Sequence, residues 1–124
     1  MKLLDTSAWV EYFKGTEKGL VVKQWLENEG MYTCLITLAE ISRWFQENNG
    51  DVSTAVEQIR QNSILLPLEE FILIESGKHY VALRKLRPKI GLIDVIIYVT
   101  ARIHDLKLIT SDSDFKGLPQ VEML

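Results

Sequence analysis

Four acidic residues lie where predicted strands and helices meet, and together they have the chemistry of a metal site. They are Asp5, Glu40, Asp94 and Asp112. Carboxylates held close together repel one another, raise each other's pKa and destabilise a fold unless a cation neutralises them. Oxygen ligands suit a hard cation, so this set predicts Mg²⁺ or Mn²⁺ and not a structural zinc.

Hydroxyl residues flank the first and the last of these acids. They are Thr6, Ser7, Thr110 and Ser111. Such side chains are suited to orienting a carboxylate by hydrogen bonding or to positioning a metal-bound water. We therefore expect them beside the metal ligands.

Ordinary structural roles compete with this interpretation for the first two acids. Asp5 follows an apolar run of strand length and precedes a predicted helix, so it suits the N-cap of that helix. Thr37 and Glu40 have the spacing of a capping box, in which the glutamate bonds back to the N-cap amide. Taken singly, neither residue demands a metal.

Structural alternatives also exist for the other acids. Asp94 lies in the first turn of a predicted helix, where the helix dipole favours a negative charge. Its apolar neighbours weaken that alternative, because a carboxylate amid so much burial needs a partner. Asp112 and Asp114 are suited to shaping a turn through side-chain bonds to nearby backbone.

The elements that position these residues alternate between short apolar strands and amphipathic helices. The predicted strands are Lys2–Leu4, Met31–Leu35, Ile64–Leu66, Lys107–Thr110 and Val121–Leu124. The predicted helices are Ala8–Phe13, Thr16–Glu29, Leu38–Asn48, Val52–Asn62, Glu69–Leu86 and Leu92–His104. This alternation predicts an α/β fold, a three-layer α/β/α sandwich with a short, mainly parallel sheet of four to five strands.

Two helices carry specific expectations about burial. In Thr16–Glu29, Leu20, Val21 and Trp25 form the apolar stripe, and Gly30 ends the helix. Glu69–Leu86 is too densely apolar for a surface helix and is expected to lie in the core.

The predicted topology brings the four acids toward one edge of the sheet. Asp5 and Asp112 follow strands that end at the same edge, and Glu40 and Asp94 lie in the first turns of helices that begin there. Ligands of open α/β sheets bind at this edge. All four carboxylates are therefore expected to point into one crevice.

Length and composition limit the class of protein. The chain has 124 residues, 47% of them apolar and 25% charged, which fits one soluble domain over residues 1–124. It has no apolar run of about 18 residues, no secretory signal pattern and a single cysteine, Cys34, so a cytoplasmic protein without membrane association is expected.

The net charge of −3 argues mildly against nucleic-acid binding, but the charge is unevenly distributed. A local group of cations precedes Gly91, and its members are Arg84, Lys85, Arg87 and Lys89. It suits either the solvated end of a helix or the guidance of a nucleic-acid strand. The other residue types that often do chemistry, the histidines His79 and His104 and the tryptophans Trp9, Trp25 and Trp44, are expected to be structural.

Four motifs in order resemble those of the PIN-domain ribonucleases, and specifically the VapC-type toxins of toxin–antitoxin pairs. The motifs are Leu4–Ser7, Thr37–Ile41, Gly91–Asp94 and Thr110–Phe115, and together they span nearly the whole chain. In this family small residues are common at the position of the bulky Ile93.

The resemblance implies an endoribonuclease in which Asp5, Glu40, Asp94 and Asp112 bind one or two metal ions and a metal-activated water attacks the phosphodiester. It adds Asp114 as an auxiliary ligand and places the hydroxyl residue of the family at Thr6, Ser7 or Thr110. It further implies an RNA substrate, a cognate antitoxin and a homodimer.

Two other classes compete with a nuclease. A receiver-type signalling domain shares the length, the architecture and an acidic Mg²⁺ pocket, but it needs paired acids after the first strand, which Leu4–Thr6 does not supply. A catalytically silent PIN-like interaction module is the second alternative, and metal titration distinguishes it from an enzyme.

Overall fold

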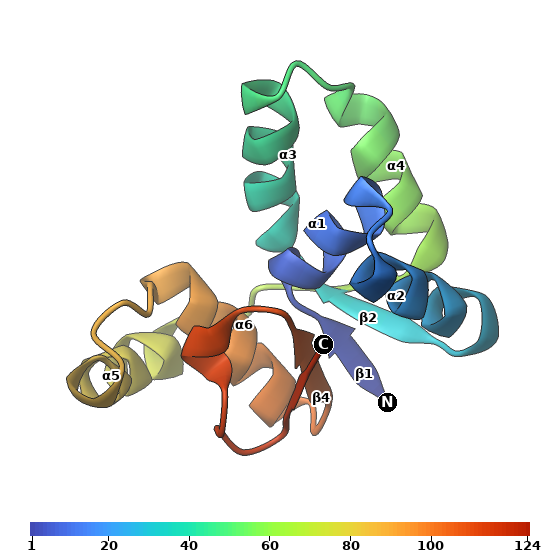
Figure 1. Ribbon diagram of the computed structural model, residues 1–124. Coiled ribbons are helices and arrows are strands. Elements are labelled where there is room, and N and C mark those ends of the chain that lie inside the picture. Colours follow the sequence, from blue (N-terminus) through green and yellow to red (C-terminus); the bar gives the residue numbers. More distant parts are fainter.

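Five short strands form one parallel sheet in the computed structural model, which describes residues 1–124 (Figure 1). They are β1 (Lys2–Leu4), β2 (Met31–Cys34), β3 (Ile64–Leu66), β4 (Lys107–Thr110) and β5 (Val121–Met123). Their order is β3-β2-β1-β4-β5, and every neighbouring pair is parallel. The order of the strands reverses between β1 and β4, and such a switch point is where α/β sheets bind ligands.

Six α-helices cover the two faces of this sheet. They are α1 (Thr6–Lys14), α2 (Glu17–Asn28), α3 (Thr37–Glu47), α4 (Val52–Asn62), α5 (Glu70–Leu86) and α6 (Leu92–Ile103), and a 3₁₀ helix, η1, spans Ser113–Phe115. Helices α1 to α4 lie on one side of the sheet, and α5 and α6 lie on the other (Figure 1). The predicted three-layer α/β/α sandwich is confirmed.

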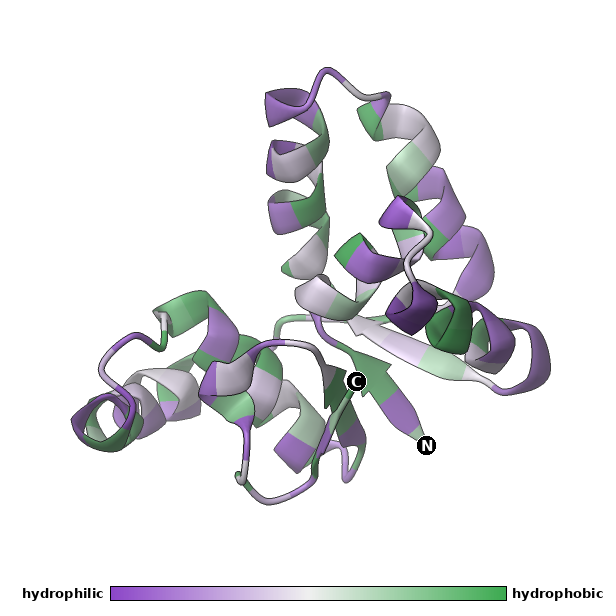
Figure 2. Cartoon of the chain, viewed as in Figure 1, coloured by the Kyte–Doolittle hydropathy of each residue, from purple (hydrophilic) through white to green (hydrophobic).

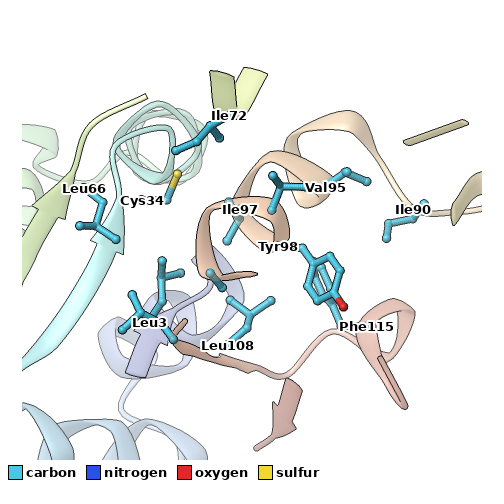
Figure 3. Packing of buried hydrophobic residues seen from close by; sticks show 13 residues of the cluster. Leu3, Cys34, Leu66, Ile72, Ile90, Val95, Ile97, Tyr98, Leu108 and Phe115 are labelled. Carbon is cyan, nitrogen blue, oxygen red and sulfur yellow. The ribbon is translucent and has the colours of Figure 1, made fainter. Parts of the chain in front are cut away.

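Alternating side chains of the central strand join the sheet to both layers. Leu3 packs into the core beneath α5 and α6 (Figure 3). Leu4 packs instead into the core beneath the first four helices. Leu108 and Ile109 of β4 divide between the same two cores. Successive strand residues point to opposite faces, so a short apolar run is enough to anchor two layers. Asp5 follows directly on this doubly buried strand.

The outward faces of two helices differ from the sequence-based expectation. In α2, Leu20 and Val21 are exposed, and Val22 is buried in their place. Helix α5 runs unbroken, but most of its large apolar side chains face solvent instead of filling the core. Figure 2 shows apolar and polar residues interspersed around it. The many apolar residues of α5 therefore do not mean that the helix is buried in the core.

Helix ends differ in smaller ways. Gly30 does not close α2, whose C-cap is the extended residue Glu29. The glycine with a left-handed C-cap conformation is Gly15, which ends α1 with φ 67°. None of the helices combines the length and the apolar composition that spanning a membrane requires.

Candidate metal-binding site at the carboxyl edge of the sheet

Asp5 is a buried carboxylate, 3% exposed, at the carboxyl end of the central strand. Its Oδ2 atom accepts hydrogen bonds from Ser7 Oγ at 2.7 Å and from Thr110 Oγ1 at 2.8 Å. Although Asp5 occupies the N-cap position of α1, its side chain makes no capping bond, and its backbone carbonyl accepts from the amides of Ala8 and Trp9 instead. The simple capping role for the Asp5 side chain is thus excluded.

The pKa of Asp5 is raised to about 6, chiefly because burial disfavours the charged form. Hydrogen bonds from Ser7 and Thr110 lower the pKa, and the charges of Asp94 and Glu40 raise it. A charged carboxylate in this place is therefore unfavourable without a neighbouring cation.

The two hydroxyls on Asp5 are themselves held by the loop that carries Asp112. The backbone amide of Ser111 donates to Ser7 Oγ at 3.1 Å, and the amide of Asp112 donates to Thr110 Oγ1 at 3.0 Å. Each hydroxyl gives its single proton to Asp5, so their mutual distance of 3.0 Å holds no hydrogen bond. The ends of β1 and β4 are thereby locked together around one carboxylate oxygen.

Glu40 is held by a second group of hydroxyls. Thr6 Oγ1 donates to Glu40 Oε1 at 2.6 Å and lies 3.0 Å from Thr37 Oγ1. Because the proton of Thr6 goes to the carboxylate, Thr37 must donate to Thr6. The fully buried Thr37 therefore orients Thr6 toward Glu40.

This arrangement corrects the capping-box interpretation of Thr37 and Glu40. The N-cap of α3 is Ile36, and no side chain caps that helix. The contact of Thr37 with Thr6 was missed, because the spacing of Thr37 and Glu40 was adequately explained by a capping box. The complete burial of Thr37 is the one feature that marks it as part of the site.

Asp94 lies at the start of α6 and is partly buried. Its Oδ2 accepts a hydrogen bond from the amide of Gly91 at 2.9 Å, so it also fulfils the structural role expected for its position. Burial raises the pKa of Asp94, the Gly91 bond lowers it, and the charges of Asp112, Glu40 and Asp114 raise it. Asp94 is thus within electrostatic reach of the other acids.

The last two acids lie on the turn that leads into η1. Asp112 Oδ1 accepts from the amide of Asp114 at 2.9 Å, the turn-shaping bond that the sequence allowed. Arg87 Nη1 donates to the carbonyl oxygen of Asp114 at 3.2 Å and ties this turn to the end of α5.

Every acid of the predicted quartet thus uses one carboxylate oxygen within the protein. The other oxygen of each, Asp5 Oδ1, Glu40 Oε2, Asp94 Oδ1 and Asp112 Oδ2, has no hydrogen-bond donor in the chain. The structure brings the acids to one edge, but it does not place three of them close enough to hold an ion between them. The acids therefore lie near enough for their charges to raise the pKa of Asp5 and of Asp94, but they do not form a complete set of metal ligands.

Comparison with known proteins identifies the family. A model of the PIN domain matches residues 2–120. The chain belongs to the PIN domain family. A search of curated proteins finds no match to this chain.

Solved structures of toxin–antitoxin proteins share the fold of this PIN domain. A toxin–antitoxin complex from Klebsiella pneumoniae is 27% identical, with a TM-score of 0.74 over 98% of this chain and 96% of that one. VapC20 of Mycobacterium tuberculosis, described as a sarcin–ricin loop cleaving toxin, is 15% identical, with a TM-score of 0.75 over 96% and 95%. DNA-bound VapBC from Salmonella typhimurium is 19% identical, with a TM-score of 0.73 over 99% and 96%.

These findings confirm the resemblance to VapC-type PIN proteins: the family is that of the PIN domain, and the fold is shared with proteins of solved toxin–antitoxin complexes. They also remove the receiver alternative. Receiver domains have the strand order 2-1-3-4-5, whereas this PIN domain has β1 between β2 and β4.

The cations beside the acidic edge do not form one uniform group. Arg84 Nε donates to the carbonyl oxygen of Pro88 at 2.6 Å and so closes the end of α5. Arg87 is half-buried and holds the Asp114 turn. Lys85 and Lys89 are exposed and form no salt bridge within the chain. Only the two lysines are free to contact a ligand without giving up an internal contact.

The donor set of this PIN domain fits a hard divalent cation. All the free atoms are carboxylate oxygens, the ligands that Mg²⁺ and Mn²⁺ prefer. Cys34 is buried in β2, and neither histidine joins the acids to form a cluster able to bind a metal. A divalent cation at this edge would oppose the desolvation cost that raises the pKa of Asp5 and Asp94.

Proposed function

We propose that this PIN domain is a Mg²⁺- or Mn²⁺-dependent endoribonuclease that hydrolyses RNA phosphodiester bonds and acts as the toxin of a toxin–antitoxin pair. The observation that carries the proposal is the Asp5 carboxylate. It is buried, it caps nothing, and its pKa is raised to about 6, while Oδ2 is fixed by two hydroxyls and Oδ1 is left free. Such a group destabilises the protein unless a cation binds it.

The chain's own residues would hold and orient the ligands. Asp5, Glu40, Asp94 and Asp112 would present their free oxygens to the cation, with Asp114 as an auxiliary ligand. Thr6 would fix the carboxylate of Glu40, and Ser7 and Thr110 would fix the carboxylate of Asp5, as they do in the structure. Thr110 would also hold the loop of Asp112, whose backbone amide donates to it. When bound, a divalent ion lowers the pKa of water and neutralises charge that develops on the phosphate. The side chains need supply no nucleophile of their own.

Exposed lysines at the end of α5 would contact the RNA backbone. Lys85 and Lys89 lie in the segment that leads to Gly91 and Asp94, and neither is engaged in a salt bridge. Lysine contacts to phosphates supply affinity without sequence preference. RNA as the substrate is supported by the fold shared with VapC20, described as a cleaving toxin of the sarcin–ricin loop.

The test is cleavage of total bacterial RNA by the purified protein, with fragment ends mapped by sequencing. We expect cleavage with Mg²⁺ or Mn²⁺, loss of cleavage with a chelator, and at least a hundredfold loss in Asp5→Asn. The matched control is Asp105→Asn, which makes the same chemical change at an exposed position outside the site with φ 53°. Full activity in Asp5→Asn, or cleavage of DNA in place of RNA, would contradict the proposal.

An antitoxin partner and a homodimer belong to the same proposal. The Klebsiella pneumoniae relative is described as a toxin–antitoxin complex. We expect a cognate antitoxin to suppress the cleavage when the two proteins are mixed. Unchanged cleavage at saturating antitoxin would remove the toxin role while leaving the nuclease activity intact.

A catalytically silent interaction module is the second candidate, and one observation favours it. Asp94 and Asp112 already satisfy backbone amides, and no three acids surround a common point. A silent module predicts no carboxylate-dependent Mn²⁺ binding. Calorimetric titration with Mn²⁺ therefore separates the two candidates, because the nuclease must bind Mn²⁺ and lose that binding in Asp5→Asn.

A further inference from the structure

One of the three tryptophans belongs to neither hydrophobic core. Trp9 is fully buried, and its Nε1 donates to Thr33 Oγ1 at 3.0 Å. Trp25 is partly buried and packs on the core beneath the first four helices. Trp44 is also partly exposed, but it packs against neither core. A place in the core therefore does not account for an indole at this position of α3.

The indole of Trp44 is held on one side and open on another. Its ring meets the ring of Phe45 edge to face, with the centroids 5.1 Å apart, and Phe45 meets Phe13 in the same way at 4.9 Å. The Nε1 atom of Trp44 donates to no atom of the chain, and it is not a buried unpaired group. The aromatic contact orients the indole, while part of its surface and its N–H group remain accessible to a ligand.

Trp44 lies one helical turn beyond Glu40 on the same face of α3. Side chains four residues apart on a helix are neighbours, with Cβ atoms about 5 to 6 Å apart. Thr37, which contacts Thr6 in the site, lies on this face one turn before Glu40. Helix α3 begins beside the start of α1 and leads away from the sheet (Figure 1). The indole therefore borders the acidic edge on the side formed by α3.

Helix α6 begins at the same edge and is preceded by exposed cations. The charge of Glu40 raises the pKa of Asp94, so the first turns of α3 and α6 lie near each other. Lys85 and Lys89 are exposed in the segment that leads to α6. An RNA strand with a phosphate at the carboxylates would thus meet lysines on the side of α6 and an aromatic ring on the side of α3.

We propose that Trp44 is the stacking platform for the RNA base next to the phosphate that is cleaved. The inference rests on the proposed nuclease function and adds to it a contact with the substrate. Every base has a π face, so stacking on an indole tolerates any base but requires that the base be unpaired. Contacts between lysines and phosphates make no such distinction. Trp44 therefore gives the site its preference for unpaired nucleotides.

The surroundings of Trp44 favour a base over a protein partner as the occupant. The residues that anchor a protein interface lie in well-packed pockets that exclude water. The exposed neighbours of Trp44 on the helix surface are polar: Glu47 is paired with Arg43 at 3.8 Å, and Asn48 bonds back to the carbonyl oxygen of Trp44 at 2.7 Å. A single ring face among polar residues suits a flat ligand that carries its own charge on a flanking phosphate.

The first test is binding of a labelled single-stranded oligoadenylate in the presence of a chelator, where no metal-dependent cleavage occurs. Trp44→Leu keeps an apolar side chain against Phe45 but has no ring, and it should bind the RNA about tenfold more weakly. Trp44→Phe retains a ring and should stay within about threefold of the natural protein. Trp25→Leu makes the same change on α2 and is the matched control, which should bind like the natural protein. Circular dichroism verifies that each variant is folded.

The second test joins the ring to one base of the substrate. An RNA that contains the mapped cleavage site is made with an abasic nucleotide next to the cleaved phosphate. The missing base should lower kcat/KM of the natural protein about tenfold and should not lower that of Trp44→Leu further, because the base and the ring form one contact. An equal loss in the two proteins would overturn the proposal.

The outcomes separate this contact from the nuclease proposal. Tighter RNA binding by the natural protein than by Trp44→Leu, without cleavage in Mg²⁺ or Mn²⁺, would reject the nuclease and retain the stacking contact. Cleavage and binding that Trp44→Leu leaves unchanged would reject the stacking contact and retain the nuclease. Unchanged RNA binding together with lost suppression by the antitoxin would assign the indole to the protein partner and would also overturn the proposal.

Discussion

Removal of the charge on Asp5 should stabilise the protein at neutral pH while it abolishes metal binding. The Asn side chain in Asp5→Asn keeps one carbonyl oxygen that can accept the hydrogen bonds of Ser7 and Thr110. It does not carry the charge that burial disfavours. This variant therefore separates the cost of the charge from the packing of the site.

The magnitude follows from the pKa of Asp5, which is about 6 in the folded protein against an ordinary value of 3.8. Each pH unit of difference corresponds to about 1.36 kcal/mol, so the ionised carboxylate lowers the free energy of unfolding by about 3 kcal/mol at pH 7.5. The folded state holds the proton more tightly, so this cost falls as the pH decreases. At pH 4.5 it is about 1 kcal/mol.

The assay is thermal unfolding of the natural protein and of Asp5→Asn at both pH values with a chelator present. At pH 7.5 the melting temperature of Asp5→Asn should lie higher by about 10 °C, and at pH 4.5 the advantage should shrink to about a third of that. The exposed Asp105→Asn variant should show no such pH-dependent difference.

Mn²⁺ should nearly cancel the stability advantage of Asp5→Asn at pH 7.5. An ion present at about 100 times its dissociation constant stabilises the protein that binds it by about 2.7 kcal/mol, which nearly offsets the cost of the charge. The natural protein should gain that stability and Asp5→Asn should not. If the advantage of Asp5→Asn is equal at pH 4.5 and 7.5, or if Mn²⁺ stabilises both proteins alike, the account of Asp5 is refuted.

Three further substitutions test other parts of the structure. Thr6→Val removes the donor to Glu40 and should lower RNA cleavage and Mn²⁺ affinity at least tenfold, whereas Thr6→Ser should retain both; equal loss in the two variants would contradict the hydrogen-bond role. Arg87→Gln breaks the tie to the Asp114 turn and should lower the free energy of unfolding in urea by about 1 to 2 kcal/mol; an unchanged value would show that the tie contributes nothing. Gly19→Ala places a Cβ 2.1 Å from a backbone oxygen and should lower stability in urea by at least about 2 kcal/mol, unless α2 can shift without loss of packing.

The strands and the edge that carries the acids could be predicted from local signals. Ile64–Leu66 and Lys107–Thr110 are strands with the predicted limits, because short apolar runs end there at a proline or at polar turn residues. The position of Asp5 follows from the same logic, since the carboxyl end of a buried strand is a binding edge in any parallel sheet.

The side of α2 that faces the core could not be predicted, because it depends on a contact with another helix. A Cβ atom at Gly19 would meet the backbone of Glu11, so Gly19 must lie directly against α1. This close approach rotates Val22 inward and leaves Leu20 and Val21 exposed. The hydrophobic periodicity of α2 alone allows either rotation.

The burial of α5 was predicted wrongly for a different reason. A dense set of apolar residues such as Phe71, Ile74 and Val81 indicates that a helix avoids water, but it does not say what covers it. A single sequence does not show whether a second molecule covers an apolar face. The same limit applies to a metal ion, whose ligands the sequence supplies but whose presence it can only imply.

The four acids of the quartet are not equally informative about function. Asp94 and Asp112 each satisfy a backbone amide, so their substitution would remove a structural bond as well as a ligand. Asp5 and Glu40 are different, because their hydrogen-bond donors are the hydroxyls of Ser7, Thr110 and Thr6, which form no helix cap with them.

A protein that needed only caps would have no use for a buried carboxylate held by two hydroxyls. The charge of Asp5 is disfavoured by burial and by the neighbouring Asp94 and Glu40, and its fixed Oδ2 leaves Oδ1 as the one atom able to gain a partner. A cation is the partner that relieves all of these costs together. Asp5 and Glu40 are therefore the positions at which loss of activity with an intact fold separates a nuclease from a silent module.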